Sequence, residues 1–513
     1  MRNINTINMI RKVLIANRGE IAVRVMRSCR EMGIRSVAVF SEADRTARHV
    51  LYADEAVLIG PAASKDSYLN IEKIIRAAKQ HKVDAIHPGY GFLSENADFA
   101  RRCKEEGIVF IGPSAETMEA MGDKISARKR MIDAGVPVVP GTQQPLQDVG
   151  EACRVCREIG FPVMLKASMG GGGKGMRLIH KEEEVEEAYN AARSESLSSF
   201  GDDTVYLEKY VEGPHHIEFQ ILGDNYGNVV NLCERECSVQ RRNQKIVEES
   251  PSPFITPELR KEMGEKAVAA AKAVDYSGAG TIEFLVDKHR NFYFLEMNTR
   301  LQVEHPITEE VLGLDLVKEQ LRIADNEPLH IRQEDISQRG HAIECRICAE
   351  DTANNFMPSP GIIRQLTEPN GIGVRIDSYV YEGYEIPVYY DPMIGKLIVW
   401  ATSREYAIER MRRVLHEYKI TGLKTNISYL RRIMDIPDFV HGTYDTSFIG
   451  KHGEELQHPV NPGDEHESEN IAMIAAYMDY LMNLEENVSG SSVDNRPISR
   501  WREFGLQKGV LRI

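Results

Sequence analysis

Residues 280–298, GTIEFLVDKHRNFYFLEMN, place two apolar β-type runs on either side of the polar segment DKHRN. This pattern predicts an antiparallel hairpin. If His289 and Arg290 lie at the centre of the turn, Glu283 lies opposite Glu296. Opposed residues of a hairpin point to the same side of the sheet. We therefore expect two carboxylates to lie together on one face.

The paired acids indicate a metal site. Like charges at this range are destabilising unless a cation or a proton lies between them. Asn298 shares the face because it lies two residues beyond Glu296. Two carboxylates and an amide oxygen are hard ligands that suit Mg²⁺ shared with substrate phosphates. The alternative is a register shifted by one residue, which turns one acid to solvent.

The same spacing continues past the hairpin through Arg300, Gln302 and Glu304. If the chain stays extended, one face carries a cation, an amide and an acid. Arg300 could hold a small oxyanion, Gln302 could orient it and Glu304 could act as a base. The alternative is an exposed charged strand, which the neighbouring apolar run FYFL disfavours.

A glycine-rich loop lies further towards the N-terminus. The strand-like run FPVMLKAS at 161–168 leads directly into MGGGGKGM at 169–176. Successive glycines let backbone N–H groups converge on phosphate. Gly175 follows Lys174 where a Walker A motif has Ser or Thr, and the β-like run MRLIH follows where a dinucleotide fingerprint opens a helix. We expect a hairpin flap over phosphates, with a flexible linker as the alternative.

Composition narrows the class of protein. The chain has 513 residues, 42% of them hydrophobic, and a net charge of −14. The negative charge disfavours a general nucleic-acid or membrane-surface binder. There is no apolar run of about 18 residues for a membrane span, and the N-terminus lacks the apolar core of a signal peptide. We expect a cytoplasmic protein.

The length predicts about three or four domains. Alternating short strands and helices predict a Rossmann-like parallel sheet over 8–111. A helical linker over 112–137, a smaller α+β lid over 138–210 and a larger mixed domain over 211–454 follow. Residues 455–513 are expected to form a linker, an amphipathic helix and a basic tail. The fold class is multidomain, α/β and α+β.

Two cysteine pairs offer a further alternative. Cys153 and Cys156 could be one half of a zinc site, with Cys345 and Cys348 as the other half. The pairs are too far apart for a compact zinc ribbon, and one lies in a helical pattern and the other in a strand-like one. We expect buried, reduced thiols.

Together these residues resemble the biotin carboxylase subunits of biotin-dependent carboxylases, in the ATP-grasp superfamily. The resemblance runs from about Ile10 to Gly450. It is carried by IANRGEIA, HPGYGFLSEN, KASMGGGGKGM, EKYVEGPHHIE, QRRNQK, FLEMNTRLQVEHP, ECRICAED and YYDPMIGKL. It implies a pre-ATP-grasp N-terminal domain, an ATP-grasp lid and core, and a C-terminal biotin carboxylase subdomain.

The resemblance also implies residue roles in ATP-dependent carboxylation of biotin by bicarbonate. ATP would be bound by Lys124, Lys166, Gly171, Gly172, Gly173, Glu208, Lys209, Val211, His216, Gln240 and Leu285. Mg²⁺ or Mn²⁺, as two ions, would be held by Glu283, Glu296 and Asn298. Bicarbonate and biotin would meet Lys245, Arg300, Gln302, Val303, Arg346, Tyr90 and Gly91. The catalytic residues would be Glu304 as base, Arg346 facing the biotin enolate, Arg300 and Lys245.

Four positions depart from the family pattern: Met169, His215, Asn243 and Cys348. The chain contains no Met-Lys-Met biotinylation motif, so we expect biotin on a separate carrier protein, a separate carboxyltransferase and a homodimer. The 455–513 tail is expected to dock another protein of the complex. Acetyl-CoA is the expected final acceptor, with propionyl-CoA or pyruvate as alternatives. The competing functions are another ATP-grasp ligase and an inactive nucleotide-binding regulatory protein.

Overall fold

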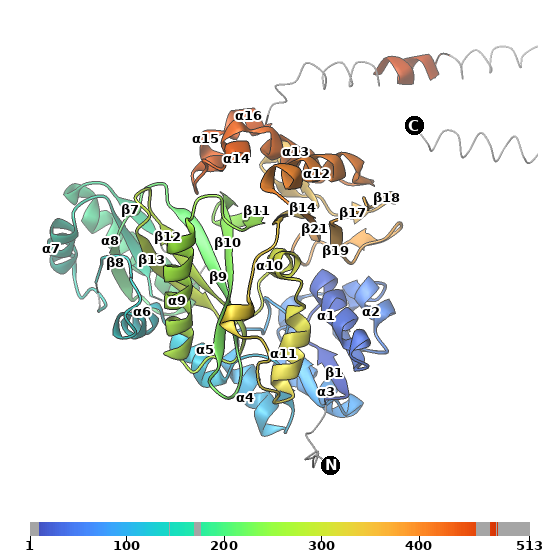
Figure 1. The fold of residues 1–513 in the computed structure, drawn as a ribbon, viewed down its shortest axis with the longest axis horizontal. Helices are drawn as coiled ribbons and strands as arrows, with labels where there is room; N and C mark the ends of the chain where they lie inside the picture. The colour runs from blue at the N-terminus through green and yellow to red at the C-terminus, as the bar shows by residue number, and fades with distance from the viewer. Residues whose placement is uncertain (1–9, 143, 169–175, 458–471, 479, 481–513) are drawn as a thin grey trace, which may run out of the picture. The chain divides into compact units, whose positions relative to one another are not determined.

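The computed structural model describes residues 10–142, 144–168, 176–457, 472–478 and 480. The chain divides into two units, residues 1–457 and 458–513. All the sheets of the described residues belong to the first unit (Figure 1).

The N-terminal part is a parallel five-stranded sheet with the order β3-β2-β1-β4-β5, shown in blue in Figure 1. Its strands are β1 (Lys12–Ile15), β2 (Arg35–Ser41), β3 (Glu55–Gly60), β4 (Ala85–His87) and β5 (Val109–Phe110). Its helices are α1 (Gly19–Glu31), α2 (Arg48–Tyr52), α3 (Ile71–His81) and α4 (Ala97–Glu105). The strand order reverses between β1 and β4, so the loops that follow these strands meet at a typical ligand-binding crevice. The predicted parallel sheet is confirmed.

Two short helices lead out of this sheet: α5 (Ala115–Gly122) and α6 (Lys124–Asp133). Each begins at a side-chain cap. Ser114 accepts a hydrogen bond from the Thr117 N–H, and Asp123 accepts from Ile125 and Ser126. Such caps satisfy donors that have no partner in the first turn of a helix.

A smaller α+β layer follows. It contains α7 (Val149–Ile159), β6 (Val163–Ala167), β7 (Arg177–Ile179), α8 (Val185–Phe200) and β8 (Val205–Lys209), with the antiparallel order β7-β6-β8. Leu165 and Leu207 lie opposite each other in its separate apolar core. Residues 169–175, between β6 and β7, lie outside the described residues. The flap prediction for Gly171, Gly172 and Gly173, and the departure at Met169, therefore stay predictions.

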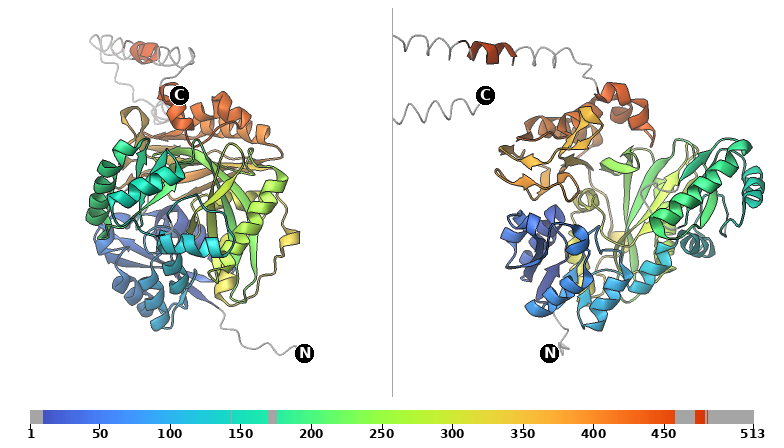
Figure 2. Two further views of the ribbon diagram at one scale, coloured as in Figure 1. Left: turned by 90° about the vertical axis from the view of Figure 1, so that its left-hand side faces the viewer. Right: turned by 180° about the vertical axis from the view of Figure 1, so that it is seen from behind.

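The largest sheet has eight strands in the order β13-β12-β9-β10-β11-β14-β21-β19, all joined by antiparallel pairing. The strands are β9 (His215–Gly223), β10 (Val229–Arg241), β11 (Gln244–Ser250), β12 (Gly278–Val286), β13 (Phe292–Asn298), β14 (His341–Cys348), β19 (Val374–Ser378) and β21 (Met393–Ala401). Three helices accompany it: α9 (Pro257–Lys272), α10 (His305–Leu312) and α11 (Leu316–Ala324). Figure 2 shows α9 along the outside of this sheet.

The last part of the first unit packs helices and short strand pairs on the far end of the same sheet. The helices are α12 (Arg404–Glu417), α13 (Ile427–Asp435), α14 (Pro437–His441), α15 (Phe448–Lys451) and α16 (Gly453–Gln457). The short strands are β15 (Glu350–Asp351), β16 (Met357–Pro358), β17 (Gly361–Ile362), β18 (Gln365–Thr367), β20 (Glu385–Ile386) and β22 (Lys419–Thr421). The predicted multidomain α/β and α+β class is confirmed.

No helix among the described residues is long and apolar enough to cross a membrane. All eight cysteines are free thiols. Cys153 and Cys156 lie on helix α7, and Cys345 and Cys348 lie on strand β14, as their patterns predicted. Cys156 and Cys345 are buried as expected, but Cys153 and Cys348 are only half-buried.

Candidate active site

A cavity of about 1460 Å³ opens in the first unit. Its walls come from the loops after β1 and β4, from the small α+β layer, from the eight-stranded sheet and from segments beyond β14. Most of the residues singled out from the sequence therefore meet at one place.

Three glutamates form a row across neighbouring strands at this cavity: Glu296 and Glu283 line it, and Glu218 is fully buried next to Glu283. Glu296 on β13 pairs with Glu283 on β12, and Glu283 pairs with Glu218 on β9. The next residue in the row is Arg235 on β10. Paired residues on neighbouring antiparallel strands point to one face, so the acids lie side by side. The predicted opposition of Glu283 and Glu296 is confirmed.

The turn itself differs from the prediction. Val286 pairs with Phe292, so the hairpin is centred on His289 and not between His289 and Arg290. A bulge between the Glu283 and Phe284 pairs restores the expected register, because Phe284 pairs with Phe294 and Leu295 is the extra residue. Leu295 thereby lines the cavity together with its neighbour Glu296.

Lys245 on β11 neutralises much of this acidic row. Its ammonium lies 2.5 Å from Glu218, 2.9 Å from Glu283 and 2.6 Å from Glu304. Burial alone would lower the pKa of Lys245, but the three carboxylates outweigh burial and raise that pKa well above its ordinary value. Lys245 therefore stays protonated. Its ammonium connects Glu218 and Glu283 to Glu304, the predicted base.

His216 also contacts the row. Its Nε2 lies 2.9 Å from Glu283, and its Nδ1 lies 2.6 Å from the amide nitrogen of Gln240. Burial lowers the pKa of His216, but the Glu283 carboxylate outweighs burial and leaves that pKa above its usual value. Burial would raise the pKa of Glu283, yet Lys245 and His216 hold it well below its usual range.

Glu296 is the acid that lacks such support. No side chain in the described part of the chain donates a hydrogen bond to its carboxylate or pairs with it. Burial and then the neighbouring Glu283 raise its pKa. The amide of Asn298 donates to Glu283 at 2.9 Å, while its oxygen accepts from Arg300 at 3.1 Å. An uncompensated carboxylate beside a second carboxylate and an amide oxygen fits a hard divalent cation.

Arg300 lies at the edge of the row of glutamates, and its guanidinium contacts the side chains of Glu95 and Gln302. It pairs with Glu95 at 2.8 Å and donates to the Gln302 side-chain oxygen at 3.2 Å. Gln302 in turn donates to Glu283 at 3.2 Å. Arg300, Gln302 and the next residue, Val303, all line the cavity.

Glu304 is placed differently from the other predicted residues. It does not line the cavity, and its side chain is fully buried behind Lys245 and Arg346. Arg346 bridges Glu304 at 3.0 Å and Glu248 at 2.5 Å. Burial would raise the pKa of Glu304, but Lys245, Arg346 and Arg235 hold it well below its ordinary value. Burial raises the pKa of Glu248 to about 7, against the attraction of Arg346.

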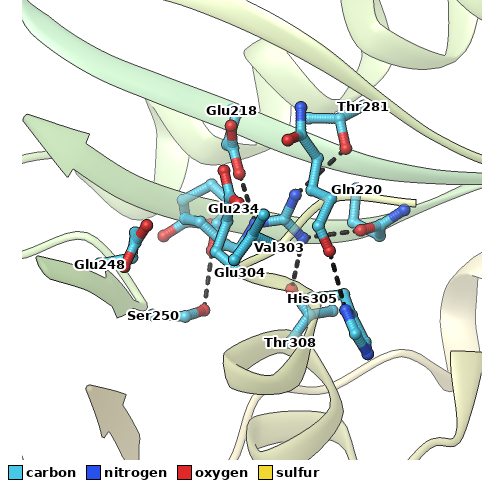
Figure 3. A network of polar contacts seen from close by, with 12 residues as sticks. Glu218, Gln220, Glu234, Glu248, Ser250, Thr281, Val303, Glu304, His305 and Thr308 are labelled. Atoms are coloured by element: carbon cyan, nitrogen blue, oxygen red, sulfur yellow. Dashed lines mark hydrogen bonds and ion pairs between the residues drawn. The ribbon is translucent and has the colours of Figure 1, made fainter. Parts of the chain in front are cut away.

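Arg235 supports this arrangement from the protein interior, and Figure 3 shows the surrounding residues. Its guanidinium, fully buried, bonds Glu218 at 2.5 Å and Gln220 at 2.7 Å. It also donates to the hydroxyls of Thr308 and Thr281, at 2.9 and 3.1 Å. Arg235 therefore holds one oxygen of the Glu218 carboxylate in place, and Lys245 contacts the other oxygen.

Another part of the wall is suited to a flat base. Glu208 accepts from Lys166 at 2.5 Å and from Arg128 at 2.8 Å. Lys209 also lines the cavity, and its ammonium donates to the carbonyls of Gly160 and Phe161. Apolar side chains complete the wall: Met164, Leu178, Val211, Leu285 and Leu295.

The N-terminal sheet contributes Tyr90 and Gly91. Asn17, in the loop after β1, donates to the carbonyls of Pro88 and Tyr90 at 2.8 and 2.7 Å. Gly89 has φ +65°, and a Cβ there would lie 2.8 Å from the Asn17 amide. Glycine is needed for both reasons, and the loop that carries Tyr90 is thereby held against the loop after β1.

Nearly all the sequence-predicted residues line this one cavity: Tyr90, Gly91, Lys124, Lys166, Glu208, Lys209, Val211, His216, Gln240, Lys245, Glu283, Leu285, Glu296, Asn298, Arg300, Gln302, Val303 and Arg346. Of the family departures, Asn243 and Cys348 line it too. His215 does not, because its ring stacks on Phe254 at 3.6 Å between ring centroids.

Sequence reasoning missed Glu218, Arg235 and Glu248. A signal for Glu218 was present, because polar residues alternate with apolar ones in HHIEFQ, at 215–220. Arg235 and Glu248 gave no such signal. They lie in runs rich in charge, CERECSVQRR and KIVEES, where alternation does not identify an inward face.

The chain is similar in sequence to known family models and to known proteins along most of its length. Three family descriptions match in succession: "Biotin carboxylase, N-terminal domain" over residues 9–118, "Carbamoyl-phosphate synthase L chain, ATP binding domain" over 123–332, and "Biotin carboxylase C-terminal domain" over 344–451. The chain is 56% identical to a biotin carboxylase of Nostoc sp. over 85% of this chain and 98% of that protein. It is 54% identical to biotin carboxylase 1 of Bacillus subtilis, over 86% and 98%. A pyruvate carboxylase component of Methanothermobacter thermautotrophicus is 55% identical, over 86% and 90%.

The chain is also similar to solved structures of biotin carboxylases. The biotin carboxylase domain dimer of Hydrogenobacter thermophilus 2-oxoglutarate carboxylase, in complex with MgADP, ADP and bicarbonate, is 51% identical with a TM-score of 0.85. The similarity covers 88% of this chain and 100% of that one. A Campylobacter jejuni biotin carboxylase in complex with an ATP compound is 49% identical with a TM-score of 0.84, covering 86% and 99%.

Proposed function

This chain belongs to the biotin carboxylase family of ATP-dependent ligases, and from that premise we propose that it carboxylates biotin on a separate carrier protein, through carboxyphosphate. The observation that carries the proposal is the contact of one buried ammonium, that of Lys245, with Glu218, Glu283 and Glu304. Lys245 lines the cavity and thereby connects the row of glutamates on the proposed phosphate side to Glu304 on the proposed bicarbonate side.

We propose that ATP lies with its base against the apolar wall around Leu285 and its phosphates towards Lys124, Lys166 and His216. The relatives whose structures contain MgADP or an ATP compound support this placement. Gly171, Gly172 and Gly173 would cover the phosphates. Lysine ammonium groups are charge-assisted donors that phosphate oxygens favour, and the His216 ring can add a further N–H donor.

Glu283, Glu296 and Asn298 are the residues that would hold Mg²⁺ or Mn²⁺, and two ions would share the two carboxylates. The uncompensated carboxylate of Glu296 is the feature that fits this role. When bound, the metal supplies neutralisation of negative charge on the phosphates. The protein itself fixes the acids in register through the β12–β13 hairpin.

Bicarbonate would lie against Arg300, Gln302 and the Val303 backbone. Its oxygen attacks the γ-phosphorus of ATP, ADP leaves, and Glu304 accepts the bicarbonate proton. Because Glu304 is covered by Lys245 and Arg346, one of these two cations has to shift before the proton can pass. The same two cations help to hold the pKa of Glu304 low, so the shift of one of them also makes the ionised carboxylate a stronger base.

Carboxyphosphate then breaks into CO₂ and phosphate. The phosphate takes the N1′ proton of biotin, and N1′ attacks CO₂. Arg346 would stabilise the enolate oxygen of biotin, with Tyr90 and Gly91 beside the ring system. Such stabilisation is strongest in a site that excludes water.

We propose a biotin carrier protein, a separate carboxyltransferase, a homodimer and a cytoplasmic location, with no nucleic-acid partner. The dimer in the Hydrogenobacter structure supports the oligomeric state. The tail is proposed to dock another protein of the complex, since the family matches end at residue 451 and the helical residues 472–478 and 480 expose Met473, Tyr477 and Tyr480.

Acetyl-CoA is the final acceptor that we propose. Pyruvate is a second candidate, supported by the similarity to the pyruvate carboxylase component of Methanothermobacter, with propionyl-CoA as a third. Affinity purification of the full chain from its native cell, followed by identification of the carrier and transferase, decides between them. Co-purification of a transferase specific for pyruvate would contradict the acetyl-CoA assignment.

The activity is tested by ATP hydrolysis that requires bicarbonate and rises with added free biotin. Another ATP-grasp ligase gives no response to biotin, and an inactive regulatory protein gives no turnover. Glu304→Gln should reduce turnover by about 10²-fold or more while ATP still binds. Undiminished turnover in Glu304→Gln would contradict the role of this residue as base.

A further inference from the structure

A fully buried lysine lies behind the biotin end of the cavity. Lys396, on β21, has no exposed side-chain surface and does not line the cavity. Burying an ammonium is costly unless it is paired and hydrogen-bonded. Its contacts show what this cation does in the fold.

The Lys396 ammonium contacts groups from two parts of the chain that form the cavity walls. It donates to the Val303 carbonyl at 2.9 Å and pairs with Glu20 at 3.2 Å. Glu20, in the first turn of α1, accepts a hydrogen bond from the Tyr90 hydroxyl. Lys396 also lies 5.8 Å from the centre of the Tyr90 ring.

Val303 and Tyr90 therefore share one anchor. Val303 follows the eight-stranded sheet and Tyr90 follows strand β4 of the N-terminal sheet, and both line the cavity. Arg346 pairs with Lys396 across β14 and β21, so the biotin-side guanidinium is built on the same strand pair.

We propose that Lys396 is a positioning residue for biotin: it fixes the Val303 carbonyl and, through Glu20, the Tyr90 side chain, so that the two walls keep the separation that biotin needs. The inference rests on the proposed carboxylation of biotin. It assigns specificity for biotin, and not for ATP, to a residue that touches neither.

A structural ion pair is the competing explanation, and the chain offers a matched control. Arg404 is also a mostly buried cation, and it joins Glu249 on β11 to the carbonyls of Phe439 and Val440. Neither Arg404 nor any of these partners lines the cavity. Its replacement removes comparable buried contacts without touching the biotin walls.

The test uses the full chain with ATP, bicarbonate and free biotin. Lys396→Met keeps the length of the aliphatic stem and removes the charge. We expect the KM for biotin to rise about 10-fold, as for a reactant that is no longer held in place, with the KM for ATP unchanged. Arg404→Met should lower the Tm and leave the KM for biotin unchanged.

Glu20→Gln is the second variant, and it decides the matter if Lys396→Met does not fold. It keeps an acceptor for Tyr90 and loses the charge that faces Lys396, so the KM for biotin should again rise selectively. In the double variant the two effects should be less than additive, since both break one connection.

The inference is overturned if the KM for biotin is unchanged in the folded variants, or if Arg404→Met raises it as much. It is also overturned if the KM for ATP rises in parallel, because the effect is then general. A wild-type chain whose bicarbonate-dependent ATP hydrolysis does not respond to biotin would overturn the proposed function itself.

Discussion

At the scale of single residues, Lys245 compensates much of the buried negative charge at the cavity. Three carboxylates lie within 2.9 Å of its ammonium, so its removal leaves an excess of buried negative charge. Loss of one partner from a buried ion pair typically costs about 3–5 kcal/mol because the remaining charge is uncompensated. Replacement of Lys245 should therefore affect the stability of the fold as well as the proposed chemistry.

Lys245→Gln should therefore reduce bicarbonate-dependent ATP hydrolysis by about 10²-fold or more. It should also lower the free energy of unfolding by a few kcal/mol, about the cost of an uncompensated buried charge. Enzyme assay and urea unfolding measure the two effects. Lys318→Gln is the control, since Lys318 pairs with Glu31 at the surface, where a pair is worth about 1 kcal/mol or less. Equal losses in both variants would contradict this account.

Buried histidines make stability depend on pH. Burial lowers the pKa of His49 to about 4, and His87 shows the same shift for the same chief cause. Between pH 6.5 and about 4 the unfolded chain binds more protons at these positions than the folded chain. The free energy of unfolding should therefore fall as the pH drops through this window.

His49→Leu should flatten part of this dependence, by up to about 3 kcal/mol between pH 7 and pH 4 for a shift of this size. Denaturant unfolding at a series of pH values measures it. His289→Leu is the control, because His289 is exposed in the β12–β13 turn. A pH profile of His49→Leu that coincides with that of the wild type would contradict the assignment.

At the scale of elements, the β12–β13 bulge determines which side chains reach the cavity. Strict alternation from Glu296 turns Leu295 to the opposite face. The bulge brings both residues to the cavity wall instead. The bulge thus places the apolar side chain of Leu295 beside Glu296, a proposed metal ligand.

Leu295→Ala should raise the KM for ATP about 5-fold, since loss of about 1 kcal/mol of apolar contact is expected for a partly exposed side chain. The turnover number should change little, because no reacting atom is touched. Val109→Ala is a suitable control: Val109 is a half-exposed strand residue outside the cavity. An unchanged KM for ATP in Leu295→Ala would refute the contact.

Local pattern was sufficient for some elements and insufficient for others. Glu283 and Glu296 were paired correctly although the turn was misplaced by half a residue, because the bulge compensates. Bulges depend on packing against neighbouring strands and leave no period in the sequence. The burial of Glu304 could not be predicted for a related reason. Strand β13 ends at Asn298, so beyond it the alternation of residues no longer indicates which way a side chain points.

At the scale of the whole molecule, pattern alone could not join the parts. Strand β14 pairs with β11 although α9, the β12–β13 hairpin, α10 and α11 lie between them in the chain. Such long-range pairing depends on tertiary contacts, and the run AIECRIC gave no partner. The parallel N-terminal sheet was predictable, because its strands and helices alternate locally.

Truncation after Gln457 tests the division into two units. Residues 1–457 contain the sheets and the whole cavity lining of the described part, so the shortened chain should keep the wild-type Tm and free-biotin activity. Pull-down with the carrier and transferase proteins should fail if the tail docks a partner. Undisturbed assembly would refute the docking role, and loss of free-biotin activity would refute the independence of the first unit.

The cavity wall includes Asn17 near one end of the first unit and Thr446 and Ser447 near the other. A ribosome must therefore synthesise almost the entire first unit before the last wall segments can join the others. A product cut short before these residues therefore lacks part of the cavity wall, however well its earlier segments fold.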